Sequence, residues 1–91
     1  MREALIVSTA RTPIGKAYRG AFNDTQAQEL GGHAIKHAVE RSKVAPDEIE
    51  DVIIGAAMQQ GSTFQNIGRQ AAIRAGLPTS VSGMSMDRQC A

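Results

Sequence analysis

The chain has 91 residues, of which 42% are hydrophobic and 3% are aromatic. A chain of this length forms one small domain at most and has a thin core, because it buries only about two thirds of the surface that its unfolded form exposes. Ten Lys and Arg residues against nine Asp and Glu leave a net charge of +1. This balance provides no electrostatic footprint for nucleic acid or an anionic membrane, so neither is expected as a partner.

The number of cysteines and the sequence of the N-terminus indicate the cellular compartment in which the protein is expected. The single cysteine, Cys90, cannot form an intramolecular disulfide. This usage is typical of a reducing intracellular compartment, so we expect a cytoplasmic protein, with an organelle as the alternative. The apolar run Ala4 to Val7 is far shorter than the hydrophobic region of a secretory signal, so we expect the sequence of a mature protein. No transmembrane segment is expected either.

Residues 4–10 form a continuous apolar and β-branched run, which is typical of a strand buried on both faces. The loop after it contains Gly15 and Lys16, a pair also found in phosphate-binding loops. Such a loop needs glycine five residues earlier and Ser or Thr after the lysine, but Ala10 and Ala17 stand at those positions. The sequence therefore predicts a strand followed by a loop that does not bind phosphate.

Residues 25–42 are predicted to form an amphipathic helix. Thr25 and Gln28 have the spacing of a capping box at its start. Apolar residues recur at helical spacing and are expected to face a sheet. They are Ala27, Leu30, Ala34, Ile35, Ala38 and Val39. Gly31 and Gly32 lie in the helix interior, where each costs about 1 kcal/mol relative to alanine, so they indicate another backbone passing close by.

Glu29, His33 and His37 follow one another at intervals of four residues on this helix. That spacing could place three metal ligands on one helix face. The polar face of an amphipathic helix often produces such triplets, and no other Cys or His in the chain could complete a site. We therefore expect no metal centre here.

The remaining elements continue the alternation. Residues 51–58 form a second apolar run and are predicted to be a strand, and residues 65–75 show a helical pattern. The segment Gly76 to Pro78 predicts a glycine cap at the end of that helix. A third strand is expected before Cys90. The order β-α-β-α-β predicts an α/β fold with parallel strands and right-handed crossovers.

Four polar residues of the second predicted helix could contact a ligand or another subunit. They are Asn66, Arg69, Gln70 and Arg74. Solvation at the protein surface is the simpler role for any one of them, so both alternatives stay open.

Cys90 is the candidate functional residue. If a helix opens after the third strand, free backbone N–H groups and the helix dipole favour a thiolate at this turn. Ligands also gather at the carboxyl ends of parallel strands. The alternative is a small buried core residue, because free cysteine is among the most buried residue types. A lone cysteine also needs His or Asn partners to become a catalytic candidate, and the chain ends before any could follow.

Four blocks of the sequence together resemble the thiolase family. They are Ala10 to Lys16, Gln65 to Ala72, Gly76 to Pro78 and Arg88 to Ala91. Their order and spacing also agree, and the resemblance covers essentially all 91 residues. It implies a thiolase-superfamily fold of five alternating layers of helices and sheets, in which residues 1–91 are a partial amino-terminal domain. A thiolase is several times longer, so we expect an amino-terminal fragment ending just after the nucleophilic cysteine.

The implied reaction is that of an acyl-CoA C-acyltransferase. It is a Claisen condensation or the thiolytic cleavage of a 3-ketoacyl-CoA, with Cys90 as the catalytic residue that carries the acyl group. Coenzyme A thioesters are the implied substrates, and no covalently bound cofactor is expected. Family members activate the cysteine with a His from a Gly-His-Pro segment and use a second Cys. Neither occurs in this sequence, so the isolated chain is expected to be inactive.

The resemblance also implies a homo-oligomer, because thiolases are dimers in which the strand before the nucleophile pairs with its two-fold mate. Here that strand would be Val81 to Asp87. The alternative function is a non-catalytic interaction module that associates with a partner supplying the missing parts. Asp87 stands where the family more often has Asn, Ser or Thr, which leaves the choice of substrate open.

Overall fold

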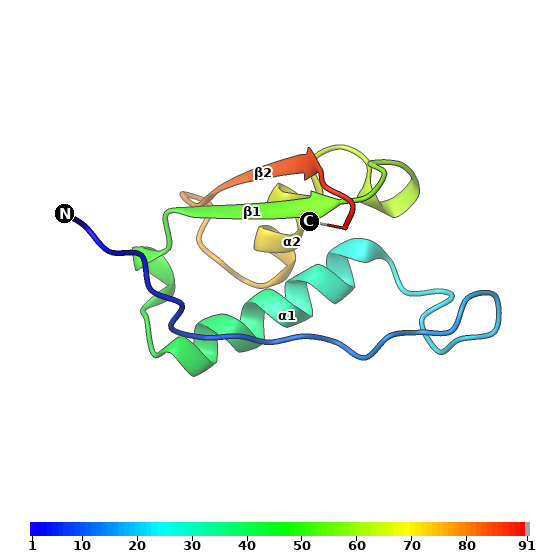
Figure 1. Cartoon of the computed structure of the whole chain (residues 1–91), viewed down its shortest axis with the longest axis horizontal. Coiled ribbons are helices and arrows are strands. Elements are labelled where there is room, and N and C mark those ends of the chain that lie inside the picture. Colours follow the sequence, from blue (N-terminus) through cyan, green and yellow to red (C-terminus); the bar gives the residue numbers. More distant parts are fainter. Residues whose placement is uncertain (91) are drawn as a thin grey trace.

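The computed structural model describes residues 1–90. Two α-helices and a two-stranded parallel sheet follow one another in this part of the chain (Figure 1). The elements are α1 (Ala27–Ser42), the 3₁₀ turn η1 (Pro46–Glu48), β1 (Asp51–Ala56), the 3₁₀ turn η2 (Gly61–Thr63), α2 (Ile67–Arg74) and β2 (Ser82–Asp87). Neither helix within residues 1–90 is long and apolar enough to cross a membrane.

The first helix begins two residues later than predicted and is capped differently. Gln26 is the N-cap residue, and its side chain makes no capping hydrogen bond. The N–H of Ala27 instead donates to the hydroxyl of Ser62, which lies in η2, at 3.0 Å. The predicted capping box of Thr25 and Gln28 is therefore wrong, because a side chain distant in sequence satisfies the helix start.

Gly31 and Gly32 lie where α1 crosses α2. A Cβ atom on Gly31 would lie 3.1 Å from Cβ of Ala71, and one on Gly32 would lie 2.8 Å from Cγ of Arg74. The prediction of another backbone close by is confirmed at Gly32, where the added Cβ would also lie 3.2 Å from the backbone nitrogen of Ala75, whereas the neighbours of Gly31 are side chains. Their absence of a side chain lets the two helices pack closely, which offsets the cost of glycine in a helix interior.

The unit from β1 to β2 is a parallel crossover, as predicted. Asp51 pairs with Ser82 and Ala56 with Asp87, so the two strands run in the same direction in register. The predicted glycine cap of α2 is confirmed, since Gly76 has a positive φ of 84°. Its N–H donates to Ile73 at 3.0 Å and that of Leu77 to Ala72 at 3.1 Å, which is a Schellman motif.

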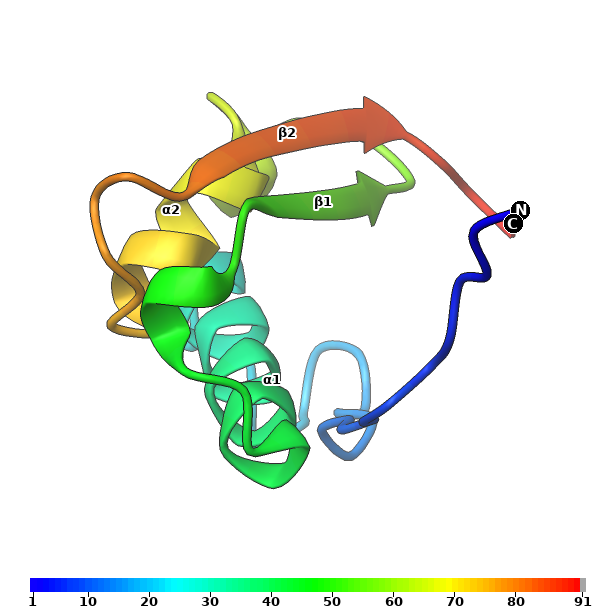
Figure 2. The ribbon, with the colours of Figure 1, turned by 90° about the vertical axis from the view of Figure 1, so that its left-hand side faces the viewer.

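The core lies between the sheet and the helices, which cover one face of the sheet (Figure 2). Ala72, Leu77 and Val81 are its buried centre. Partly buried side chains from α1, the end of η1, β1 and the end of α2 surround them, namely Ile35, Val39, Ile49, Val52 and Ala75. On the opposite face the register partners Ile53 and Met84 are exposed. The sheet therefore has one packed face and one open apolar face.

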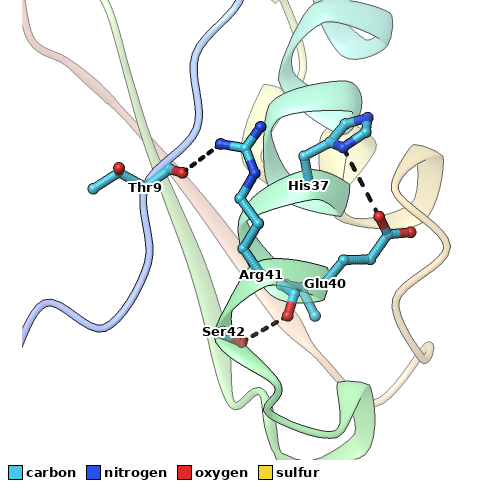
Figure 3. A network of polar contacts seen from close by, with 6 residues as sticks. Thr9, His37, Glu40, Arg41 and Ser42 are labelled. Atoms are coloured by element: carbon cyan, nitrogen blue, oxygen red, sulfur yellow. Dashed lines mark hydrogen bonds and ion pairs between the residues drawn. The ribbon is translucent and has the colours of Figure 1, made fainter.

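The predicted strand over residues 4–10 is not formed. The segment runs past α1 and away from the sheet (Figure 1). The guanidinium of Arg41 donates to the carbonyl of Thr9 at 2.9 Å (Figure 3). A strand needs a neighbouring backbone for its N–H and C=O groups, and the segment has no such ladder within residues 1–90. The α/β class is unchanged, but the strand count is one fewer than predicted.

Candidate functional site

Cys90 lies just beyond the carboxyl end of the parallel sheet. The ladder continues one residue past β2, because the N–H of Arg88 donates to the carbonyl of Ala56 at 2.9 Å. Cys90 follows this last bond by two residues, and its side chain is exposed. The exposed thiol does not fit the alternative of a small buried core residue.

The carboxyl ends of the two strands are tied together by side chains. The amide of Gln59, in the segment after β1, donates to the carboxylate of Asp87 at 3.1 Å. A Cβ on Gly55 would lie 2.8 Å from Cβ of Arg88, so the arginine packs directly on the glycine backbone. Asp87 therefore has a structural partner three residues before Cys90.

An open apolar cavity of about 510 Å³ lies beside the end of β1. The start of α1, the end of β1 and η2 contribute to its lining. Its apolar residues include Ala27, Ile54, Ala56, Met58 and Ile67. The residues that line this cavity within the described part of the chain do not include Cys90. The thiol and the cavity are therefore separate features.

The start of α2 is bonded to β2 through Asn66 and Ser85. The carboxamide oxygen of Asn66 accepts from the N–H of Arg69 at 3.2 Å, and its nitrogen donates to the carbonyl of Gly83 at 2.9 Å. The hydroxyl of Ser85 accepts from the N–H of Gly68 at 2.8 Å and donates to the Asn66 oxygen at 3.0 Å. Sequence reasoning missed Ser85, because its partners lie 17 to 19 residues away.

The other polar residues of α2 also bond within the chain. The guanidinium of Arg69 donates to the carbonyls of Val81 and Thr79, the latter at 3.1 Å. The side chain of Gln70 donates to the carbonyls of the two residues before Asn66, each at 2.8 Å. The guanidinium of Arg74 pairs with Glu29 at 3.4 Å. Their contacts therefore support a structural role rather than the ligand role left open by the sequence.

The candidate metal triplet does not converge. The rings of His33 and His37 lie 4.4 Å apart between centroids. Glu29 pairs with Arg74, while Nδ1 of His37 lies 3.8 Å from Glu40 (Figure 3). No group of three His, Cys, Asp or Glu side chains within residues 1–90 is placed to hold a metal ion.

Comparison with known proteins gives matches over nearly the whole chain. The family described as the thiolase N-terminal domain matches residues 4–91. The acetyl-CoA acetyltransferase of Cupriavidus necator is 44% identical over 90 residues, covering 99% of this chain and 22% of that protein. The 3-ketoacyl-CoA thiolase of Colwellia psychrerythraea is 38% identical over 91 residues, covering 99% of this chain and 24% of that protein.

A third relative is of a different length. The acetyl-CoA acetyltransferase of Clostridioides difficile is 40% identical over 90 residues, covering 99% of this chain and 82% of that protein. The chain thus spans about a quarter of the length of the first two relatives and most of the third.

Proposed function

Because the chain belongs to the thiolase family, we propose that it supplies the nucleophile-bearing strand of an acyl-CoA C-acyltransferase. Its relatives are named acetyl-CoA acetyltransferase and 3-ketoacyl-CoA thiolase. Coenzyme A thioesters are accordingly the proposed substrates. The site is proposed to work in a reducing intracellular compartment, where Cys90 stays a free thiol.

In the proposed thiolytic direction, the thiolate of Cys90 attacks the 3-keto carbon of a 3-ketoacyl-CoA. The bond between C2 and C3 breaks, and its electron pair takes up a proton at C2 to release acetyl-CoA. The acyl group stays on Cys90 as a thioester. The thiolate of a second coenzyme A then attacks this thioester, which gives the shortened acyl-CoA and restores the Cys90 thiolate. Condensation is the same sequence in reverse.

The exposed position of Cys90 at the carboxyl end of the parallel strands, within a family match that includes it, carries this proposal. A nucleophile must reach its substrate, and ligands of open parallel sheets bind at that end. The backbone N–H of Cys90 is proposed to donate to the oxyanion that forms during attack, where one such donor contributes roughly a hundredfold or more in rate.

The test compares the 91 residues alone with the same residues joined to the remainder of the Cupriavidus necator relative. Cleavage of acetoacetyl-CoA is followed in both. The isolated chain lacks a general base for Cys90, so we expect at least about 10⁴-fold less turnover than in the joined protein. The joined protein with Cys90→Ser should lose activity, and Cys90→Ala should match it.

Turnover by the isolated chain at the level of a complete thiolase would contradict the proposed inactivity. Full activity of the Cys90→Ser joined protein would contradict the role of Cys90 itself. Mass analysis after incubation with acetyl-CoA adds a direct readout, since the acyl group should be found on the peptide that contains Cys90.

We also propose that the segment Val81 to Asp87 pairs with a second copy of the chain. The N–H groups of Ser82 and Arg88 donate towards β1. Strand N–H groups alternate in direction, so those of Gly83, Ser85 and Asp87 face the other edge. That edge has no strand partner within residues 1–90. The carbonyls of Val81 and Gly83 on this edge already accept from the side chains of Arg69 and Asn66, so the outward N–H groups are what favours association with another strand.

Asp87→Pro tests this pairing, because it removes an outward N–H and leaves the backbone bonds of β2 to β1 in place. It also removes the side-chain bond to Gln59, so Asp87→Ala is the matched control for that loss. Sedimentation should show a dimer for the parent chain and a weaker one for the variant. Asp47→Pro, placed in η1 away from the edge, is the control. A monomer at high concentration in the parent would contradict the proposal.

The non-catalytic interaction module is kept as the second candidate because of the open apolar face of the sheet. Ile53 and Met84 are exposed there and are suited to burial against a partner. Both functions therefore need further protein on this face. Partner binding by the Cys90→Ser joined protein separates the two functions. An interaction module would still bind its partner without the thiol, whereas catalysis would be lost.

A further inference from the structure

We propose that Asn66 and Ser85 act as a positioning pair that sets the register of β2 against α2, and through it the place of Cys90. The inference rests on the proposed role of Cys90 as the nucleophile. The hydroxyl of Ser85 and the carboxamide of Asn66 are directly bonded although they are 19 residues apart. One belongs to the strand that leads to Cys90 and the other to the start of the helix beside it.

The pair completes the cap of α2. The first N–H groups of a helix have no partner inside the helix. Here the N–H of Gly68 donates to the hydroxyl of Ser85 at 2.8 Å, and that of Arg69 donates to the side chain of Asn66 at 3.2 Å. One of the two capping groups therefore belongs to β2, and it reaches the helix only when Ser85 stands opposite Gly68.

Two glycines bring the backbones of α2 and β2 into contact at this point. A Cβ on Gly83 would lie 2.5 Å from the backbone nitrogen of Arg69. A Cβ on Gly68 would collide with the carbonyl oxygen of Met84. Backbone atoms cannot rotate away as a side chain can, so neither position accepts a larger residue.

These contacts admit one register. A slip of β2 by one residue would bring Ser82 or Met84 to the place of Gly83. The same slip would bring Met84 or Met86 to the place of Ser85. The first change creates a clash, and the second leaves the N–H of the helix without an acceptor. A one-residue slip also moves every side chain of the strand to the other face.

The register matters for the chemistry because Cys90 follows Ser85 by five residues. A slip of one residue moves a strand by about 3.3 Å along its axis. A misplacement of about 1 Å in a reacting group can lower a rate about a hundredfold. The pair thus acts on the reaction through the strand and does not itself touch the substrate.

The backbone supplies a matched control. Gln65 and Asn66 both have positive φ, 58° and 59°. Glycine tolerates this conformation, so Gln65→Gly and Asn66→Gly relax the same backbone strain. Within residues 1–90 the side chain of Asn66 bonds to β2, whereas the side chain of Gln65 makes no hydrogen bond to that strand. Only Asn66→Gly removes the positioning contact.

Cross-linking measures the register of β2 against β1, which shifts by the same step when β2 slips past α2. Ile53 and Met84 are register partners and both are exposed on the open face of the sheet. In a background carrying Cys90→Ser, Ile53→Cys and Met84→Cys, a disulfide between positions 53 and 84 forms readily only in the native register. We expect Asn66→Gly and Ser85→Ala to slow its formation at least tenfold relative to Gln65→Gly. Ser85→Thr keeps the hydroxyl and should restore the parent rate.

If Asn66 and Ser85 only stabilise the fold and do not set the register, the cross-linking rate changes differently. The folded fraction of Asn66→Gly or Ser85→Ala would then cross-link at the parent rate although its melting temperature is lower, and this would overturn the proposal. If Asn66→Gly does not fold, the contrast between Ser85→Ala and Ser85→Thr decides in the same way. Cross-linking does not depend on turnover, so a joined protein that is inactive overturns the proposed function without touching this result.

Discussion

Residues 4–10 and β1 have similar sequences and different structures. Both are apolar, β-branched runs, yet only β1 has a strand beside it. Val52 of β1 packs against the core, whereas Leu5, Ile6 and Val7 are largely exposed. An apolar pattern therefore specifies a preference for burial, while a neighbouring backbone decides whether the segment becomes a strand.

Glycine-to-alanine changes in β2, the strand that pairs with β1, and in the loop after residues 4–10 should show the largest difference in the free energy of unfolding. Gly83→Ala places a Cβ 2.5 Å from the backbone of Arg69, whereas Gly15→Ala meets the side chain of Phe22 at 2.9 Å. A side chain can rotate away and a backbone cannot. We expect Gly83→Ala to lower the free energy of unfolding by about 3 kcal/mol, near the upper end for overpacking, and Gly15→Ala by less than about 1 kcal/mol. Urea unfolding measures both, and equal midpoints would show that the close contact at Gly83 relaxes as easily as the one at Gly15.

A matched pair of valines gives the next largest effect. Val81 is 1% exposed and Val7 is 67% exposed. Val81→Ala removes two buried methyl groups and leaves a cavity, so we expect a loss of about 2 kcal/mol. Val7→Ala should change the free energy of unfolding by less than about 0.5 kcal/mol. A comparable loss in both variants would show that the N-terminal segment is buried in solution.

Two arginines, one bonded to the loop before β2 and one to the N-terminal segment, should show a smaller difference in the free energy of unfolding. Arg69 donates to two carbonyls of the loop before β2, and Arg41 donates to the carbonyl of Thr9 (Figure 3). We expect Arg69→Ala to cost about 1 to 2 kcal/mol, because both of its bonds are charge-assisted and the one to Val81 is partly buried. Arg41→Ala should cost less than about 0.5 kcal/mol, since its bond is exposed.

Limited proteolysis gives the second readout for this pair. Arg41→Ala should accelerate cleavage within the N-terminal segment and leave cleavage of the remaining chain unchanged. Unchanged cleavage of that segment would mean that the bond to Thr9 does not hold it.

The sequence by itself determined the elements whose signals are local. The apolar periods of α1 and α2 placed both helices, and Gly76 marked the end of α2 because only its positive φ allows that cap. The apolar run over residues 51–58, in alternation with two helical patterns, implied parallel crossovers, of which the one from β1 to β2 forms within residues 1–90. The family blocks pointed to Cys90, and its place after a strand follows from the chain order alone.

The tertiary structure decided what depends on distant partners. Residues 4–10 carry the pattern of a strand, but the pattern names no neighbour, and none pairs with them within residues 1–90. Ser62 caps α1 and Ser85 caps α2 from 35 and 17 residues away, and nothing in the local sequence marks either serine. Hydrogen bonds depend on positions in space, so the arrangement leading to Cys90 became visible only in the folded chain.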